Sequence, residues 1–173
     1  MIRFALLGCG RIGAMHAQNL AGAPGGQLAT VYDTAAEAAR AVAERFGCAV
    51  AASAEAAIRS VDAVLIATST ATHADLIEIA ATAGKAILCE KPIDLSLDRV
   101  KACRAAIAGC NVPIQIGFNR RFDPGHRAAR VARMAGEIGT LEQVVITSRD
   151  PAPPPRSYVG GSGGLFRDMT IHD

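Results

Sequence analysis

Short apolar runs alternate with longer amphipathic runs over residues 2–118, and this alternation constrains the fold more than any other feature. The short runs are rich in Val, Ile and Leu, as expected for strands buried on both faces, and they cover residues 2–8, 27–33, 62–68, 85–91 and 114–118. The longer runs predict helices, and they cover residues 12–22, 35–47, 72–84 and 96–109. Together they predict a parallel sheet with helices on both faces and right-handed crossovers.

The rest of the chain has a weaker pattern. Residues 125–136 predict a further helix, and residues 141–149 predict a sixth strand. Residues 150–164 are so rich in Pro and Gly that neither a helix nor a strand ladder is expected to persist through them. This segment is therefore predicted to be a linker or a loop over a binding site.

Composition and charge argue against several classes of partner. Half of the 173 residues are hydrophobic and 20% are charged, which suits a globular domain. The formal net charge of +2 is too small to indicate a nucleic-acid or membrane partner. The arginines within residues 119–133 are spread around a helix, which favours a solvated face over a polyanion site. No apolar run is long enough for a signal peptide or a membrane span.

The five cysteines predict buried thiols in a reducing compartment. Their number is odd, they form no C-x-x-C pair, and no neighbouring histidine stands at metal-binding spacing. We therefore expect a cytoplasmic protein without a metal site.

A glycine-rich turn follows the first predicted strand. Gly8, Gly10 and Gly13 form the pattern G-x-G-x-x-G between a strand and a helix, with Arg11 and Ile12 inside it. The first glycine permits a tight turn, the second lets the backbone approach a pyrophosphate, and the third lets helix and strand pack closely. Free N–H groups at the start of the helix favour the phosphates of a dinucleotide.

Asp33 ends the second predicted strand, where its carboxylate can accept hydrogen bonds from the ribose hydroxyls of a dinucleotide. The same charge would repel the extra phosphate of NADP, so we predict NAD as the cofactor. An ordinary strand-to-helix turn with a surface aspartate is the alternative interpretation.

Polar residues follow the ends of the third and fourth predicted strands, where ligands collect in open parallel sheets. We predict that Thr68, His73, Glu90 and Lys91 line the cofactor cleft, with Lys91 beside the nicotinamide and with Glu90 and the following proline fixing its presentation. Helix capping is the alternative role for His73, and His16 is expected to pack inside the first helix.

The fifth predicted strand is followed by Asn119 and Arg120, which are candidates for contact with cofactor or substrate. Arg149 and Asp150 are weaker candidates of the same kind.

Asp168 and His172 stand four residues apart near the end of the sequence, the spacing that places two side chains on one helical face. An imidazole is suited to accept a hydroxyl proton near neutral pH, and the aspartate could fix its tautomer or bind a neighbouring substrate hydroxyl. Lys91 could donate to the developing alkoxide. Spacing alone is equally compatible with a surface pair.

Taken together, the segments GCGRIGAMHAQNL, EKPI, GFNRRFDP and SGGLFRDMTIHD resemble the Gfo/Idh/MocA oxidoreductase family, and most closely its inositol 2-dehydrogenases. The resemblance runs over residues 2–173. It implies an α/β fold, with a Rossmann-type doubly wound parallel sheet that binds NAD in residues 1–118. Residues 119–173 would be the truncated start of an α+β substrate domain. It also implies oxidation of a cyclic polyol, myo-inositol to 2-keto-inositol, with Lys91, Asp168 and His172 as catalytic residues.

The resemblance further implies an enzyme of about twice this length that forms a homo-oligomer, a dimer or a tetramer, and that binds a small polyol. Two alternatives stay open: a non-catalytic NAD-binding sensor of the same family, and a truncated inactive fragment. Retention of the three catalytic residues favours the enzyme over the sensor. For the 173-residue chain alone we expect NAD binding with weak or absent turnover.

Overall fold

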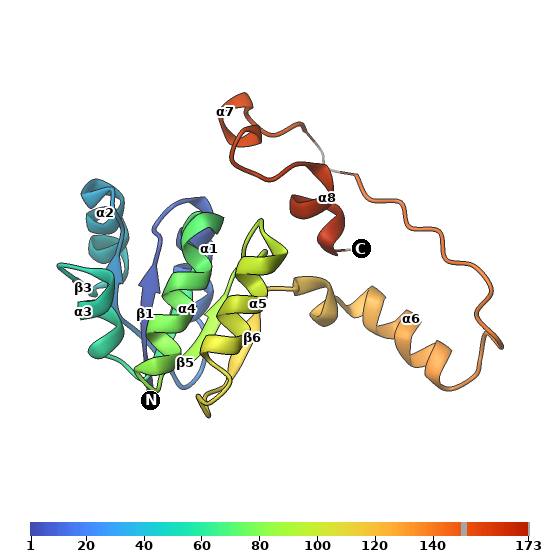
Figure 1. Ribbon diagram of the computed structural model, residues 1–173, viewed down its shortest axis with the longest axis horizontal. Coiled ribbons are helices and arrows are strands. Elements are labelled where there is room, and N and C mark those ends of the chain that lie inside the picture. Colours follow the sequence, from blue (N-terminus) through green and yellow to red (C-terminus); the bar gives the residue numbers. More distant parts are fainter. Residues whose placement is uncertain (150–151, 173) are drawn as a thin grey trace. The chain divides into compact units, whose positions relative to one another are not determined.

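The computed structural model describes residues 1–149 and 152–172. The chain divides into two compact units, Met1–Gly117 and Phe118–Asp173 (Figure 1).

A sheet of six parallel strands forms the centre of the first unit (Figure 1). Its strands lie in the order β3-β2-β1-β4-β5-β6, so the strand order reverses between β1 and β4. The bounds are β1 (Ile2–Leu7), β2 (Gly26–Tyr32), β3 (Ala49–Val50), β4 (Ala63–Ile66), β5 (Ala86–Cys89) and β6 (Ile114–Ile116). This reversal is the topological switch point at which open α/β sheets bind their ligands.

Helices pack on both faces of this sheet. Alternate residues of β1 point to opposite faces: Ala5 and Leu7 belong to a core with α3, α4 and α5, while Leu6 belongs to a second core with α1 and α2. The bounds are α1 (Arg11–Ala21), α2 (Ala36–Phe46), α3 (Ala54–Arg59), η1 (Thr70–Thr72), α4 (His73–Thr82) and α5 (Leu97–Ala106). The predicted doubly wound parallel fold is confirmed.

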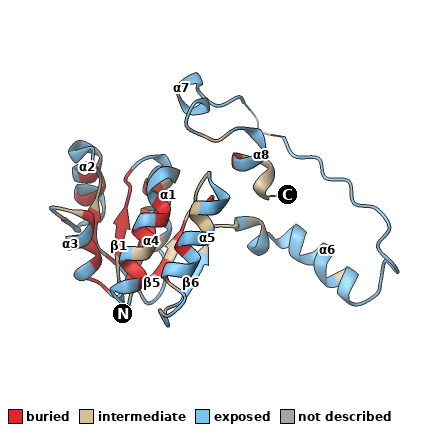
Figure 2. Cartoon of the chain, viewed as in Figure 1, coloured by how far each residue is buried: buried red, intermediate tan, exposed pale blue. Residues whose placement is uncertain are grey.

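Buried residues concentrate in the strands of the first unit and on the sheet-facing sides of its helices (Figure 2). Two helices of this unit start at serine caps: Ser53 accepts from the backbone N–H of Ala56, and Ser96 accepts from that of Arg99. Within the described residues, no helix has both the length and the apolar character that a membrane crossing requires.

The strand β3 and the helix α3 of the first unit were not predicted. The strand β3 has only two residues, both exposed, so it carries no apolar run. The helix α3 has only six residues, which is too short to show the helical period in its apolar residues. Both lie between the predicted second helix and third strand, and they leave the rest of the predicted order intact.

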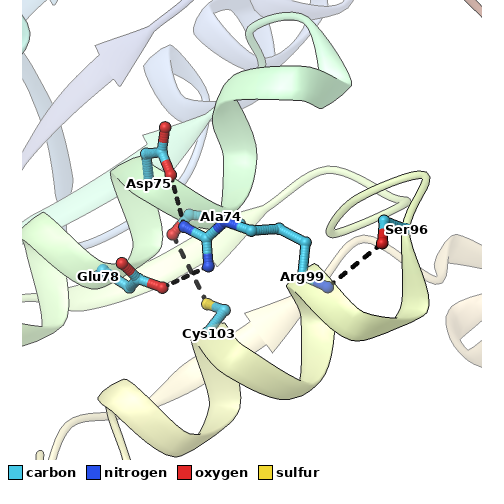
Figure 3. Close-up of polar contacts among 6 residues, drawn as sticks. All are labelled: Ala74, Asp75, Glu78, Ser96, Arg99 and Cys103. Carbon is cyan, nitrogen blue, oxygen red and sulfur yellow. Dashed lines mark hydrogen bonds and ion pairs between the residues drawn. The ribbon is translucent and has the colours of Figure 1, made fainter.

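An ion-pair cluster joins α4 to α5 (Figure 3). The guanidinium of Arg99 on α5 donates to Asp75 at 2.5 Å and to Glu78 at 2.6 Å, both on α4. The thiol of Cys103 lies 3.6 Å from the carbonyl oxygen of Ala74 in the same interface. These contacts fix α5, the helix that follows the segment carrying Lys91, against α4.

The second unit contains short helices and extended segments. Its elements are η2 (Asn119–Phe122), α6 (Pro124–Met134), α7 (Arg156–Val159), α8 (Leu165–Asp168) and η3 (Thr170–His172). The side chain of Asp123 caps α6 by accepting from the backbone N–H of His126. The helix predicted over residues 125–136 is therefore present.

One prediction for this unit is wrong. Residues 141–149 form no strand, because a strand needs a pairing partner and the described chain supplies none; Val144 and Val145 are 62% and 79% exposed. The Pro- and Gly-rich segment contains a helix, α7, which is only one turn long and begins directly after Pro155. A proline preceding the first turn does not interrupt helical hydrogen bonds. As predicted, neither a helix nor a strand ladder persists through the described residues of this segment.

Candidate functional site

The glycine turn sits at the switch point of the sheet. Gly8 has a φ of +91°, and a Cβ at this position would lie 2.4 Å from the carbonyl oxygen of Ala67 and 2.7 Å from the amide nitrogen of Thr68. The turn after β1 is therefore pressed against the end of β4. Only glycine fits both the left-handed conformation and this close approach.

Gly13 and Gly10 differ in what a side chain would meet at their positions. A Cβ on Gly13 would lie 1.9 Å from the carbonyl oxygen of Gly8, so α1 packs directly on the turn. A Cβ on Gly10 would meet no described atom within 4 Å, and Gly10 has an ordinary φ of −70°. Nothing in the described part of the chain requires glycine at residue 10, and open space remains beside the backbone at the start of α1. A dinucleotide pyrophosphate fits this space.

Asp33 is tied to the glycine turn. One carboxylate oxygen accepts from the backbone N–H of Cys9 at 2.7 Å, and the other accepts from that of Ala35 at 2.7 Å. A carboxylate has about four lone-pair positions, so capacity remains for ribose hydroxyls. Burial, together with the nearby charge of Asp33, raises the pKa of the Cys9 thiol to about 12, so this thiol stays neutral beside the turn.

Thr68 lies in the segment that links β4 to α4, and His73 is the first residue of α4. His73 is 1% exposed; its Nδ1 lies 2.7 Å from the carbonyl oxygen of Pro92 and its Nε2 lies 3.1 Å from that of Thr68. The His73 ring therefore lies between the backbones of two segments, and the ring nitrogen that carries the hydrogen donates to the carbonyl oxygen that it faces. The hydroxyl of Thr72 bonds to that of Thr68 at 2.8 Å.

The segment Glu90–Lys91–Pro92 follows β5 and contains a cis peptide bond between Lys91 and Pro92. Lys91 is half-buried. Contrary to the expectation of simple packing, His16 places its Nε2 2.7 Å from Oε1 of Glu90. No sequence pattern indicated this contact, because 74 residues separate the two partners.

Asp168 and His172 do not share one continuous helix, as their spacing had suggested. Asp168 is the last residue of α8, and His172 closes the separate 3-10 turn η3. Met169 between them has φ −100° and ψ −61°, and α8 is one turn long after Gly164. A helix of one turn makes too few hydrogen bonds to extend without tertiary support, so α8 ends before it reaches His172.

Asp168 is buried, and its Oδ1 accepts from the hydroxyl of Tyr158 at 3.0 Å. Tyr158 is a site neighbour that the sequence reasoning missed. It lies in the Pro- and Gly-rich segment, which was expected to be a linker or a loop over a site and which offered no pattern for a specific contact.

A groove in the second unit is lined by Asn119 and Arg120 together with Ser148 and Arg149. The guanidinium of Arg120 donates to the hydroxyl of Ser148 at 2.8 Å. Asp150, a weaker sequence candidate, lies outside the described residues.

The comparisons with known proteins agree with this geometry. The model of the Gfo/Idh/MocA oxidoreductase family with an NAD-binding Rossmann fold matches residues 2–118. Inositol 2-dehydrogenase of Rhizobium meliloti is 52% identical over 173 residues, which cover 99% of this chain and 52% of that protein. Myo-inositol 2-dehydrogenase of Thermotoga maritima is 39% identical over 181 residues, which cover 99% of this chain and 52% of that protein.

Two solved structures extend the comparison. Myo-inositol dehydrogenase of Corynebacterium glutamicum has a TM-score of 0.92 at 46% identity, over 100% of this chain and 53% of that one. Scyllo-inositol dehydrogenase of Lactobacillus casei, solved with bound NAD(H) and scyllo-inositol, has a TM-score of 0.89 at 32% identity, over 100% of this chain and 54% of that one. The chain thus spans about half the length of the curated relatives it matches.

These matches confirm the resemblance to the family and the prediction of NAD as the cofactor. The chain belongs to the Gfo/Idh/MocA family of oxidoreductases with an NAD-binding Rossmann fold.

Proposed function

We propose that the protein oxidises a secondary alcohol of a cyclic polyol, with myo-inositol converted to 2-keto-inositol. The observation that carries the proposal is the presence of Lys91, Asp168 and His172 in a chain 52% identical to an inositol 2-dehydrogenase. In this proposal residues 1–118 form the NAD-binding domain and residues 119–173 begin the substrate domain.

The backbone at the start of α1 holds the cofactor phosphates in this proposal. The open space beside Gly10 admits the pyrophosphate, and the N–H groups of Arg11 and Ile12 face it from the first turn of the helix. Asp33 accepts from the ribose hydroxyls, and Thr68 contributes its hydroxyl at the end of β4. NAD supplies the hydride acceptor when bound.

Three side chains carry the proton chemistry. His172 accepts the hydroxyl proton as hydride leaves the carbinol carbon. Asp168, with one oxygen already bound by Tyr158, orients the imidazole or binds a neighbouring substrate hydroxyl. The ammonium of Lys91 donates to the substrate oxygen as negative charge develops there, which lowers the barrier electrostatically.

The groove residues Asn119 and Arg120 are proposed to contact the substrate. We also propose that the complete protein is a cytoplasmic homo-oligomer, a dimer or a tetramer.

The test uses the gene product that contains this chain, with NAD and myo-inositol, and follows NADH by its absorbance. Lys91→Met is expected to reduce turnover by at least about a hundredfold while NADH still binds. Lys101→Met is the matched control, because Lys101 is a surface residue that pairs with Asp98. NADH binding by the unaltered protein without turnover of any inositol would refute the dehydrogenase and favour the sensor.

A further inference from the structure

His16 and Glu90 form a pair that joins the glycine-turn helix to the segment carrying Lys91. His16 lies in α1, five residues after Arg11, and its Nε2 is 2.7 Å from Oε1 of Glu90. Their side chains are only 16% and 21% exposed, so solvent screens this contact far less than it screens an ion pair on the surface. A carboxylate can only accept, so the imidazole Nε2 carries the shared hydrogen.

The surroundings of Glu90 are shaped for its carboxylate. A Cβ added to Gly117, which follows β6, would lie 3.1–3.2 Å from the carboxylate atoms, so glycine leaves the room that the group occupies. Burial by itself raises the pKa of the Glu90 carboxyl, but the hydrogen bond and charge of His16, with those of Lys91, lower it more. The carboxylate is therefore ionised at neutral pH and is held by His16 from α1 and by the adjacent Lys91.

The backbone on either side of Lys91 is also fixed. The amide of Glu90 donates to the carbonyl oxygen of Ile66 at 2.9 Å, and the carbonyl oxygen of Pro92 lies 2.7 Å from Nδ1 of His73. Lys91 therefore lies in a short segment whose backbone is held by hydrogen bonds on both sides. The backbone N–H of Lys91 also bonds to the Glu90 carboxylate, so the position of that carboxylate acts directly on the Lys91 backbone.

We propose that His16 and Glu90 are positioning residues that couple the cofactor-binding start of α1 to the placement of Lys91. The first turn of α1 and His16 move as one body, because one rigid helix carries both. A cofactor phosphate that fixes the start of α1 thus also fixes the partner of Glu90. The coupling rests on the proposed NAD-dependent function, but the placement of Lys91 by the pair does not need the cofactor.

The experiment observes Lys91 by NMR in the 173-residue chain. The sequence contains three lysines, Lys85, Lys91 and Lys101, so ¹³C-labelled lysine gives three ε-CH₂ signals that single Lys→Arg variants assign. Without cofactor, His16→Leu is expected to shift and broaden the Lys91 signal and to leave the other two unchanged. His16→Gln, which retains an N–H at about the position of Nε2, is expected to restore the signal.

The second readout is NADH affinity by fluorescence titration. His16→Leu and Glu90→Gln are each expected to weaken NADH binding roughly tenfold, and the double variant no more than the worse single one, because the two changes remove one interaction. Arg99→Met, which loosens α4 from α5 without touching Glu90, is the control for general destabilisation and is expected to leave the Lys91 signal and NADH affinity unchanged.

The two proposals fail in different ways. A Lys91 signal that is the same in His16→Leu as in the unaltered chain, without cofactor, overturns the positioning pair. Fully additive losses of NADH affinity in the double variant overturn it as well. Absence of NADH binding by the unaltered chain contradicts the proposed function and the coupling, while the cofactor-free Lys91 signal still decides whether the pair places the lysine.

Discussion

Alanine substitutions at Gly10 and Gly13 separate the binding of cofactor from the packing of the fold. A Cβ on Gly13 would lie 1.9 Å from the carbonyl oxygen of Gly8, about 1.5 Å short of an ordinary 3.4 Å contact. Because that oxygen is backbone, the turn or the helix has to move. We expect Gly13→Ala to lower the free energy of unfolding by roughly 1–3 kcal/mol, as overpacking does, and to weaken NADH binding as well.

Gly10→Ala is expected to weaken NADH binding without a loss of stability. No described atom lies within 4 Å of the new Cβ and the φ of −70° suits alanine, so stability stays the same or rises by about 0.4–1 kcal/mol. The methyl group occupies the space assigned to the pyrophosphate. Loss of one charge-assisted hydrogen bond is worth roughly 1.5–3 kcal/mol, which corresponds to a Kd for NADH roughly ten- to a hundredfold higher.

Urea unfolding and fluorescence titration with NADH measure the two effects on the same samples. Gly109→Ala is the matched control, because its Cβ also meets open space but lies at the end of the α5 segment, away from the turn. It is expected to change neither stability nor affinity by much. Wild-type affinity for NADH in Gly10→Ala would refute the assignment of this space to the cofactor.

Three further substitutions follow from the same contacts. Asp33→Asn is expected to weaken NADH binding roughly tenfold and to reduce the preference for NADH over NADPH, since an amide does not repel the extra phosphate. Titration with both cofactors checks this, and an unchanged ratio of the two Kd values would count against it. Arg99→Met is expected to lower the urea midpoint with NADH affinity unchanged, because Arg99 binds Glu78 on α4 and not the cofactor turn. Glu90→Gln is expected to reduce the slope with which the free energy of unfolding falls as the pH is lowered. The pKa of the Glu90 carboxyl is lowered in the fold, so its stabilisation is present above the unfolded value near 4.5 and is lost as pH falls through the folded value. Urea unfolding between about pH 3 and pH 7 measures the slope, and an identical slope in the variant would contradict it.

The fold of the first unit was predictable because its central strands are largely buried. An uninterrupted run such as residues 62–68 identifies a central strand without knowledge of its partners. The two-residue strand β3 has no such run, and its pairing with β2 depends on tertiary contact alone. In the second unit the apolar residues of 141–149 suggested a strand, but strand formation requires a partner, which a local pattern does not specify.

The candidate site was predictable where one short motif holds all the relevant groups. The glycine turn is such a motif: the structure gives separate steric reasons for Gly8 and Gly13, and it leaves open space beside Gly10. Contacts across the sequence were not predictable in this way. His16 meets Glu90 because the fold brings α1 beside the end of β5, and Tyr158 meets Asp168 through an irregular segment without periodicity.

Hydride transfer from inositol to the cofactor is the decisive measurement. The gene product that contains this chain is incubated with NAD and with myo-inositol carrying deuterium at C2, and the NADH formed is analysed by mass spectrometry. We expect deuterium in the nicotinamide ring and slower turnover than with unlabelled myo-inositol. NADH without deuterium would contradict oxidation at C2, and tight NADH binding without any reduction of NAD would contradict the proposed dehydrogenase.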